Sequence, residues 1–329
     1  MVGNWLITGG CGFLGTALIK YLRKNGLASH IRVLDNLTVG TREDLSSVCE
    51  FTESSPSCLQ NDPANFLVEL VVGDIRDQDM CTACCHGMDV VIHLAANTGV
   101  PVSVEHPRLD MECNVIGTFN MLEAARQKKV PRFVFASSGA PAGEVEPPIH
   151  EELPPHPVSP YGASKLAGEG YCSAYYKSYG VETVCLRFSN VYGPGSTHKS
   201  SVVAKFIKQA LNGETLVIYG DGTQTRDFIY IDDLINALYF AAIKKGIGGE
   251  TFQIATSRET TLDEITEFLL KAFEDHGLTC PQVEKTEPRL GDVKRNFSDT
   301  SKAKEILGWE CHMELQEGID RTINWFKLR

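Results

Sequence analysis

The sequence predicts an α/β protein built on a doubly wound parallel sheet, with a smaller α/β lobe at its C-terminal end. Short apolar runs alternate with helical patterns over the first two thirds of the chain, the order that parallel sheets require. A glycine-rich turn joins the first apolar run to the first helical pattern, and the alternation gives way to another pattern after Asn190. The 329 residues, of which 43% are hydrophobic, suffice for a sizeable core.

Apolar runs mark the expected strands of the sheet. They lie at residues 5–8, 31–34, 67–72, 90–94, 132–136 and 181–188. Helical patterns lie between or after them, at 16–25, 77–87, 107–127 and 161–179. The polar stretch 46–65 predicts a surface excursion, and the seven prolines of 141–160 predict an extended loop.

The second part of the chain has its own pattern. Short apolar segments at 215–219, 228–231 and 251–254 are separated by helices, one of which begins at the capping box Thr261-Leu-Asp-Glu264. We therefore expect residues 1–190 to form one domain. Residues 191–329 are expected to form mainly the smaller lobe, with some of this chain returning to the first domain.

Composition and charge exclude several classes of protein. The net charge of −11 opposes binding to nucleic acid, which depends on neutralising phosphates. No apolar run reaches the roughly 20 residues that cross a bilayer. The first strand begins at about Trp5, which leaves no room for a signal peptide in front of it. We therefore expect no membrane partner and a cytoplasmic location.

The eleven cysteines are expected to be free thiols, because their number is odd and the chain is long. Cys81, Cys84, Cys85 and His86 have a spacing that resembles metal ligands. They fall within an expected helix, and no second pair of such ligands occurs elsewhere in the sequence, so we expect no metal site.

The turn after the first strand has the composition of a dinucleotide-binding site. It reads Thr8-Gly-Gly-Cys-Gly-Phe-Leu-Gly15, with glycines spaced GxxGxxG between a strand and a helix. Such a turn lets the backbone approach a pyrophosphate, to which the helix N-terminus offers free N–H groups. Asp35 closes the second strand, where a carboxylate meets the ribose hydroxyls of adenosine. The pattern predicts a Rossmann-type domain that binds NAD, since this acid repels the 2′-phosphate of NADP.

Tyr161 and Lys165 lie four residues apart at the start of an expected helix and therefore share one face. The ammonium of Lys165 is expected to lower the pKa of the Tyr161 phenol. The phenolate can then remove a proton from a sugar hydroxyl while hydride leaves the same carbon. Ser138, at the end of a strand, can hydrogen-bond the same oxygen.

With these motifs the chain resembles the extended short-chain dehydrogenases, and among them the NAD-dependent sugar epimerase/dehydratase family. The similarity extends from about Trp5 to Trp325. The matching stretches are TGGCGFLG, VLDN at 33–36, GDIRD at 73–77, HLAA at 93–96, NVIGT at 114–118, FASS at 135–138, SPYGASK at 159–165, LRFSNVYGPG at 186–195, DGTQTRDFIYIDDL at 221–234 and PRLGDVKRNFSDTSKA at 288–303.

The resemblance implies a role for each matching residue. Catalytic roles fall on Ser138, Tyr161 and Lys165. Cofactor-binding roles fall on Gly9, Gly12, Phe13 and Leu14 at the pyrophosphate, Asp35 and Asn36 at the ribose, Asp74 and Ile75 at the adenine, and Ala95, Asn114, Tyr161, Lys165 and Phe188 at the nicotinamide side. Roles in binding a UDP-sugar fall on Asn190, Arg226 and Arg289 at the diphosphate, Asp292 at its ribose, and Val217 and Tyr219 at the uracil.

The residues after Ser138 separate the reactions of this family. The related 4,6-dehydratases carry an Asp-Glu pair there, which supplies the acid and base for losing water. This chain has Gly139-Ala140, which cannot move a proton. We therefore expect C4 epimerisation of a UDP-sugar through a transient 4-keto intermediate. A catalytically silent NAD-binding protein is the alternative from another class, but such proteins typically lose the tyrosine or the lysine.

Two features leave the sugar open. Pro141-Ala142 replaces the Val-Tyr that relatives usually carry, and Asn296 stands where bulk excludes an N-acetyl group. UDP-glucose and UDP-galactose are expected first, with a UDP-N-acetylhexosamine as a further candidate. UDP-glucuronate is the main alternative, because Thr98, Ser103 and Ser137 could bind its carboxylate. The second alternative is the reaction of another NAD-dependent nucleotide-sugar dehydratase or reductase.

The resemblance also implies a homodimer in which the helices at 107–127 and 161–179 of two subunits form a four-helix bundle. Both segments carry apolar residues at helical spacing. These residues are Met111, Val115, Phe119, Leu122, Leu166 and Tyr176.

Overall fold

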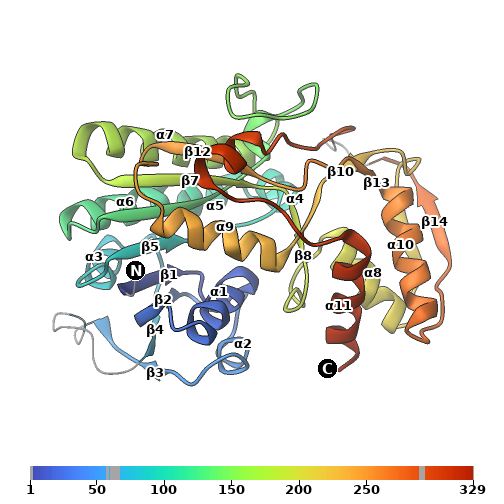
Figure 1. Ribbon diagram of the computed structural model, residues 1–329, viewed down its shortest axis with the longest axis horizontal. Helices are drawn as coiled ribbons and strands as arrows, with labels where there is room; N and C mark the ends of the chain where they lie inside the picture. The colour runs from blue at the N-terminus through green and yellow to red at the C-terminus, as the bar shows by residue number, and fades with distance from the viewer. Residues whose placement is uncertain (1–2, 57–58, 60–66, 289–292, 329) are drawn as a thin grey trace.

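An eight-stranded parallel sheet forms the centre of the computed structural model, which describes residues 3–56, 59, 67–288 and 293–328. The strand order is β12-β7-β6-β5-β1-β2-β4-β3 (Figure 1). The strands are β1 (Gly3–Thr8), β2 (Ala28–Asp35), β3 (Thr52–Glu53), β4 (Val68–Val72), β5 (Val90–His93), β6 (Arg132–Ser138), β7 (Glu182–Phe188) and β12 (Glu250–Ile254).

Helices cover both faces of this sheet, so the expected doubly wound α/β fold is confirmed (Figure 1). Leu6 and Phe133 point into an apolar cluster with the helices of one face, whereas Ile7 and Val134 point into the cluster of the opposite face. The first face carries α3 (Gln78–Cys84), α6 (Gly117–Gln127) and α7 (Pro160–Tyr179), and the opposite face carries α1 (Phe13–Lys24) and α9 (Ile231–Ile243).

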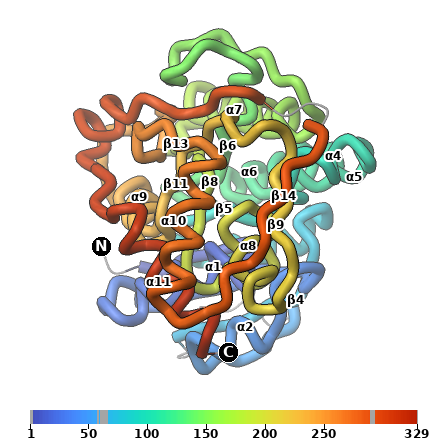
Figure 2. Tube along the Cα trace, turned by 90° about the vertical axis from the view of Figure 1, so that its right-hand side faces the viewer, coloured from blue at the N-terminus to red at the C-terminus, as the bar shows by residue number. Residues whose placement is uncertain are grey.

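The C-terminal lobe stands at one end of the sheet (Figure 1), and Figure 2 views the molecule from that end. It combines helices with two-stranded sheets. The predicted capping box is confirmed at the start of α10, where the Thr261 hydroxyl accepts from the Glu264 N–H and the Glu264 carboxylate accepts from the Thr261 N–H. The elements of the lobe are α8 (Val202–Leu211), β9 (Leu216–Tyr219) paired with β14 (Val283–Thr286), β10 (Thr225–Arg226) paired with β13 (Thr260–Thr261), α10 (Leu262–Asp275) and α11 (Leu315–Lys327).

Shorter elements connect these layers. β8 (Asn190–Tyr192) pairs with β11 (Phe228–Tyr230) at the junction of the sheet and the lobe. The remaining elements are α2 (Arg42–Ser46), α4 (Val100–Glu105), α5 (Pro107–Met111), the π-helical η2 (Glu112–Ile116), η3 (Ala140–Ala142) and the π-helical η4 (Ala303–Leu307).

Three segments differ from what the sequence indicated. The helix expected at 107–127 contains a π-helical turn, η2, between α5 and α6. The surface excursion at 46–65 includes β3, which pairs with β4 at the edge of the main sheet. The apolar segment at 251–254, grouped above with the smaller lobe, lies within β12 and pairs with β7 at the opposite edge. The structures of the last two segments depend on pairing with distant strands, and a short apolar or polar run does not show with which strand it will pair.

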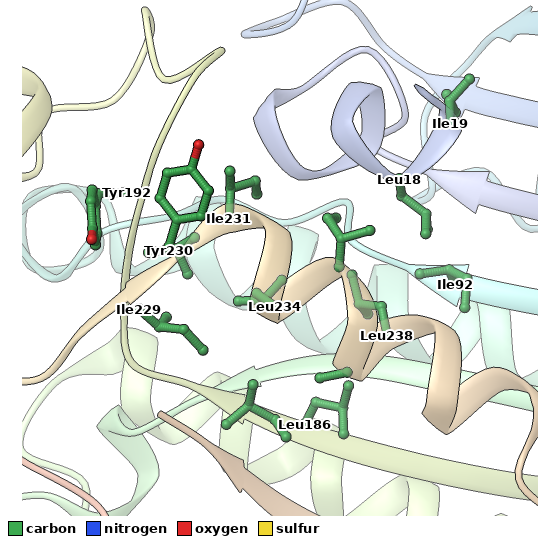
Figure 3. Close-up of a cluster of buried hydrophobic side chains, with 14 of the residues drawn as sticks. Leu18, Ile19, Ile92, Leu186, Tyr192, Ile229, Tyr230, Ile231, Leu234 and Leu238 are labelled. Carbon is green, nitrogen blue, oxygen red and sulfur yellow. The ribbon is translucent and has the colours of Figure 1, made fainter. Parts of the chain in front are cut away.

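A continuous apolar core joins the sheet to the lobe. Figure 3 shows α9 contributing Leu234 and Leu238 to a cluster that also contains Leu18 of α1, Ile92 of β5 and Leu186 of β7. The same cluster continues through β8 and β11 into α10 and α11. The two parts of the chain therefore share one core.

Two aromatic side chains mark the point where this core passes from the sheet to the lobe. The Tyr192 and Tyr230 rings meet edge to face with their centroids 5.6 Å apart. The Tyr192 hydroxyl donates to the Leu315 carbonyl at 3.3 Å, which ties β8 to α11. These contacts fix the lobe against the sheet.

Most of the described cysteines are buried, whereas Cys280 is exposed. The ten that the structure describes are all free thiols. Cys81, Cys84 and Cys85 are buried against α6, and burial raises the pKa of Cys84 to about 12. Within the described ranges, no three His, Cys, Asp or Glu side chains gather as metal ligands. The same ranges hold no helix with the length and apolarity that a membrane crossing requires.

Gly15 allows α1 to pack closely on the preceding turn, so its replacement should destabilise the fold. A Cβ at Gly15 would lie 2.5 Å from the Gly9 carbonyl oxygen, whereas a Cβ at Gly170 in α7 meets no atom within 4 Å. We expect Gly15→Ala to lower the free energy of unfolding by about 1–3 kcal/mol. Gly170→Ala, the matched control, should raise it by up to about 1 kcal/mol. Chemical denaturation measures both, and an unchanged Gly15→Ala protein would contradict the packing described.

Candidate active site

The carboxyl ends of five adjacent strands converge where the sheet faces the lobe (Figure 1). Thr8, Asp35, His93, Ser138 and Phe188 are the last residues of β1, β2, β5, β6 and β7. The chain leaves β1 for β2 on one side and returns to β5 on the other, so the strand order reverses here. Open α/β sheets bind ligands at such a point.

The glycine turn between β1 and α1 is shaped to receive an anion. Gly9 has φ +68°, and a Cβ there would lie 2.9 Å from the Ala95 backbone nitrogen, so only glycine fits. Gly12 is the N-cap of α1, and no side chain caps the first turn, which begins with Phe13 and Leu14. The N–H groups of this turn therefore remain available to a phosphate.

Asp35 braces the same turn. One carboxylate oxygen accepts from the Cys11 N–H at 2.9 Å, and the other accepts from the Leu37 N–H at 2.9 Å. Burial raises the pKa of Asp35, while these two backbone hydrogen bonds act in the opposite direction. Each oxygen keeps a lone pair, which leaves the carboxylate able to accept from ribose hydroxyls as the sequence predicts.

A polar group beside Asp35 surrounds the position predicted for adenine. The Asn36 side-chain amide donates to Asp74 at 3.0 Å, and Arg76 donates to both oxygens of Asp74 at 3.0 and 2.8 Å. The bond from Arg76 is the main reason why the pKa of Asp74 is lowered to about 2. An open pocket lies beside these residues, lined by Asp74, Arg76, Asp77, Glu112 and Ile116. Ile75, the other residue predicted to flank the adenine, is buried.

A buried hydrogen-bond chain that the sequence did not reveal connects β1, β5 and α6. The Thr8 hydroxyl lies 2.8 Å from Nδ1 of His93, and Nε2 of His93 lies 3.1 Å from the Thr118 hydroxyl. Burial lowers the pKa of His93 to about 3, so the imidazole is neutral. The Ala95 N–H donates to Thr8 at 3.1 Å. These hydrogen bonds fix the ends of β1 and β5, the strands that Gly9 and Ala95 follow.

Ser138, Tyr161 and Lys165 come together as the sequence predicts. Ser138 ends β6, whereas the other two lie in the first turns of α7, which Ser159 caps. The Ser138 hydroxyl lies near the Tyr161 phenol and acts to lower the pKa of that phenol. The Lys165 ammonium donates to the Ala136 carbonyl at 2.8 Å and lies 5.9 Å from the centre of the Tyr161 ring.

The electrostatics of this trio differ from the sequence-based expectation. Burial raises the pKa of Tyr161 to about 12, and the nearby Asp110 carboxylate adds to the rise, while the Ser138 hydroxyl acts in the opposite direction. Burial lowers the pKa of Lys165 to about 8. The expected lowering of the Tyr161 pKa by Lys165 is absent here, because the ammonium bonds to the Ala136 carbonyl instead of facing the phenol oxygen. In this arrangement the phenol is protonated at neutral pH.

Asn114 lies in the π-helical turn η2 and is fully engaged. Its amide nitrogen donates to the Asn97 carbonyl and to Asp110 Oδ1, each at 2.9 Å, and to the Ser164 hydroxyl at 3.2 Å. Its amide oxygen accepts from the Asn97 N–H at 2.8 Å. The π-turn thereby positions a rigid amide beside Tyr161 and Lys165, a common use of such turns at functional sites. Its contact with a nicotinamide stays a prediction.

The segment after Ser138 leaves open space at the site. The Ala140 N–H donates to the Ser138 hydroxyl at 3.2 Å, and the Gly139 N–H donates to the Phe188 carbonyl at 3.3 Å. A Cβ at Gly139 meets no atom within 4 Å. Pro141 and Ala142 then turn inward and are buried. No proton donor or acceptor is therefore supplied by the side chains at 139 and 140.

A buried ion pair holds α7 against β7. Both oxygens of Glu169 accept from Arg187, at 2.8 and 2.7 Å, and one also accepts from the Ser137 hydroxyl at 2.6 Å. Ser137 is therefore committed to Glu169. Ser103 is likewise buried, with its hydroxyl donating to the Val100 carbonyl at 2.7 Å.

The carboxylate-binding set that the sequence indicated is thus reduced. Thr98, in the loop after β5, is exposed, unlike Ser103 and Ser137. Spacing alone could not reveal this, because the orientation of a hydroxyl depends on the partner it finds in three dimensions.

The lobe presents its predicted residues from three places. Asn190 begins β8, and its N–H donates to the Asp227 carbonyl at 2.9 Å. Val217 and Tyr219 share the half-buried face of β9. The Asn296 N–H lies 3.3 Å from the Thr225 hydroxyl.

Arg226 lies in β10, and backbone oxygens hold its guanidinium in place. One guanidinium nitrogen donates to the Thr225 carbonyl at 2.6 Å and to the Val293 carbonyl at 2.7 Å. Arg289 and Asp292, predicted to bind the diphosphate and its ribose, lie outside the described residues.

Comparisons with known proteins agree with this architecture. Residues 5–255 match the family described as the NAD dependent epimerase/dehydratase family. A protein of Methanocaldococcus jannaschii named putative UDP-glucose 4-epimerase is 37% identical over 328 residues, which cover 98% of each chain.

Two solved structures are similar over nearly the whole chain. The UDP-glucose 4-epimerase of Thermotoga maritima, solved with UDP-glucose, is 35% identical over 99% of both chains, with a TM-score of 0.86. The UDP-glucose 4-epimerase of Thermus thermophilus, solved in complex with NAD, is 35% identical over 98% of this chain and 99% of its own, with a TM-score of 0.84.

Breaking the ion pair under the site should destabilise the protein. Glu169→Gln leaves the Arg187 guanidinium buried without a counter-charge, and we expect a loss of about 3–5 kcal/mol in the free energy of unfolding. Glu317→Gln is the matched control, because the pair of Glu317 with Arg321 is exposed on α11 and screened by solvent, so its loss should change the free energy of unfolding far less. Equal effects of the two substitutions in urea denaturation would show that the buried pair has no special role.

Proposed function

The chain belongs to the NAD dependent epimerase/dehydratase family, and we propose that it catalyses the NAD-dependent C4 epimerisation of a UDP-sugar through a transient 4-keto intermediate. UDP-glucose and UDP-galactose are the first candidates, since the similar proteins of Methanocaldococcus jannaschii and Thermotoga maritima are named for this substrate. A UDP-N-acetylhexosamine is a further candidate. A cytoplasmic location and a role in carbohydrate metabolism belong to the same proposal.

NAD fits the residues at the end of β1. The uncapped N-terminus of α1 suits a pyrophosphate, and the free lone pairs of Asp35 suit ribose hydroxyls while disfavouring a 2′-phosphate. We assign the pyrophosphate to Gly9, Gly12, Phe13 and Leu14. When bound, NAD supplies the hydride acceptor and returns the same hydride, so no net oxidation occurs. The remaining cofactor contacts are assigned to Asn36, Asp74, Ile75, Ala95, Asn114, Lys165 and Phe188.

Tyr161 is the proposed base, and Ser138 is proposed to hydrogen-bond the same substrate oxygen. The Tyr161 phenolate takes the proton of the sugar C4 hydroxyl as C4 loses its hydride, and gives the proton back when the hydride returns to the other face. The raised pKa of Tyr161 means that the site must gain positive charge before the phenolate forms. Lys165, four residues along α7, supplies that charge if it exchanges the Ala136 carbonyl for the catalytic hydroxyls.

The observation that carries the choice of reaction is the pair Gly139-Ala140 beside Ser138. Loss of water from C5 and C6 of the sugar requires an acid and a base at this point, and neither side chain can act as one. The 4-keto intermediate can then only turn over and be reduced again. The burial of Ser103 and Ser137 weighs against UDP-glucuronate, whose carboxylate needs committed hydroxyl or cationic partners.

The lobe is proposed to hold the UDP group. Arg226 and Asn190 suit the diphosphate, and the backbone of Val217 and Tyr219 suits the uracil edge. Arg289 and Asp292 complete this site in the proposal, and Asn296 and Thr98 lie toward the sugar.

We also propose a homodimer through α5, η2, α6 and α7. Large apolar side chains are exposed on these elements, among them Leu109, Met111, Ile116 and Tyr171. The face keeps Met111 from the set expected from helical spacing. It differs at two others, because Leu122 is fully buried inside the subunit and Tyr176 packs against Gly248 and Gly249.

Replacing the proposed base should abolish turnover and spare binding. We expect Tyr161→Phe to reduce the rate of UDP-glucose epimerisation by about 100- to 10,000-fold, the range for a general acid–base group. The affinity for UDP should stay unchanged, because the lobe binds that part of the substrate. Ser138→Ala should cost less, since it removes one hydrogen bond. If Tyr161→Phe keeps more than about a tenth of the activity, Tyr161 is not the base.

The dimer can be tested with two substitutions that start from the same exposure. Met111 in α5 and Leu211 at the end of α8 are each 38% exposed, but only Met111 lies on the proposed interface. Met111→Lys should shift the mass measured by light scattering at micromolar concentration toward the monomer, because it buries a charge in the interface. Leu211→Lys should leave the dimer intact. A wild-type monomer under these conditions would refute the proposal.

A further inference from the structure

The segment between β8 and α8, residues 193–200, crosses from the lobe to the dinucleotide turn (Figure 1). A Cβ at Gly195 would lie 3.4 Å from the Phe13 ring, so the backbone at Gly195 passes close to that side chain. His198 Nε2 lies 3.1 Å from a carboxylate oxygen of Asp44 in α2. We refer to residues 193–200 as the crossing segment.

Hydrogen bonds from α8 and within the segment itself hold the crossing segment in place. The Lys208 ammonium, in α8, donates to the Thr197 and Lys199 carbonyls at 2.9 Å each. The Ser196 hydroxyl is buried and donates to the Gly193 carbonyl at 2.7 Å. The segment is therefore anchored at its base, while its outer side lies against Phe13 and Asp44.

Lys199 of this segment has no carboxylate partner among the described residues. Its ammonium lies 5.4 Å from the centre of the Phe13 ring and donates to the Val191 carbonyl at 3.3 Å. Within the described part of the chain it forms no ion pair, and burial alone lowers the pKa of its ammonium to about 8. A cation that is desolvated against an aromatic ring and one carbonyl is poorly compensated.

The position of Lys199 indicates the missing partner. Phe13 is the first residue of α1, directly after the N-cap Gly12, so its ring stands at the uncapped N-terminus described above. A diphosphate bound there would bring negative charge to the side of the turn on which Lys199 lies. Lysine is well suited to this task, since it binds phosphate as a point charge.

We propose that Lys199 of the crossing segment binds the diphosphate of the dinucleotide at the glycine turn, so that the lobe closes over the cofactor and retains it. This inference rests on the proposed binding of NAD. It adds a contact to the cofactor from the part of the chain that carries the substrate site. An enzyme that regenerates its cofactor in every cycle needs such retention, because a lost NAD interrupts turnover.

The test compares the binding of NAD and of UDP to the purified full-length protein by isothermal titration. Lys199→Met keeps an apolar side chain against Phe13 and removes the charge, and Lys199→Arg keeps the charge. We expect Lys199→Met to weaken NAD binding by about tenfold or more, with UDP binding within about twofold of wild type. Lys199→Arg should stay within about threefold of wild type for both ligands.

Lys177→Met is the matched control, because Lys177 also lies over an aromatic ring, Tyr176 at 5.2 Å, but at the far end of α7. It should bind NAD as wild type does. NAD affinity unchanged in Lys199→Met would overturn the inference, as would weaker UDP binding with NAD unchanged, which would assign Lys199 to the substrate. Equal losses of NAD affinity in Lys199→Met and Lys199→Arg would also overturn it, because the charge kept by Lys199→Arg would then not support binding. A wild-type protein that binds no NAD would instead refute the proposed function.

Discussion

The close contact of α7 with β6 and β7 is the constraint on which the site depends. This helix carries Tyr161 and Lys165 on the face that must meet the end of β6. Gly168 permits the approach, since a Cβ there would lie 2.5 Å from the Phe135 ring. The buried bonds of Glu169 to Arg187 then fix the position of α7 along β7. With α7 so held, the hydroxyls of Ser138 and Tyr161, from two elements distant in sequence, lie close together.

The same constraint explains the electrostatics of the site. A helix packed this tightly excludes water, and burial therefore dominates the pKa values of Tyr161 and Lys165. Both groups are biased toward their neutral forms, the form that a dry site favours. Charge introduced by a bound cofactor changes this balance, so cofactor binding and the activation of Tyr161 are linked in the proposed mechanism.

Much of the fold could be predicted, because it follows from local patterns. The strand, glycine turn and helix at 3–24, the pairing of Tyr161 with Lys165 at one helical turn, and the capping box at Thr261 are each encoded by neighbouring residues. Sequence patterns predict best those elements whose stabilising contacts lie within one segment. The family resemblance extended this to residues far apart, such as Ser138 and Asn114.

What the sequence could not predict depends on partners that meet only in the fold. Lys165 faces the Ala136 carbonyl, Ser137 is committed to Glu169, and Lys199 reaches Phe13 across the two parts of the chain. β3 and β12 join the sheet through pairing with distant strands. In each case the residue type was visible, but its partner was not, and the partner decides the direction of a pKa or the availability of a hydroxyl.

The central claim is that the hydride taken from C4 returns to the same carbon, with no loss of water. The most direct measurement follows deuterium in UDP-glucose labelled at C4 during incubation with the purified protein and NAD. The account predicts UDP-galactose that retains the label at C4, with no accumulation of NADH. Loss of the label to solvent, or release of a 4-keto-6-deoxy sugar, would contradict it.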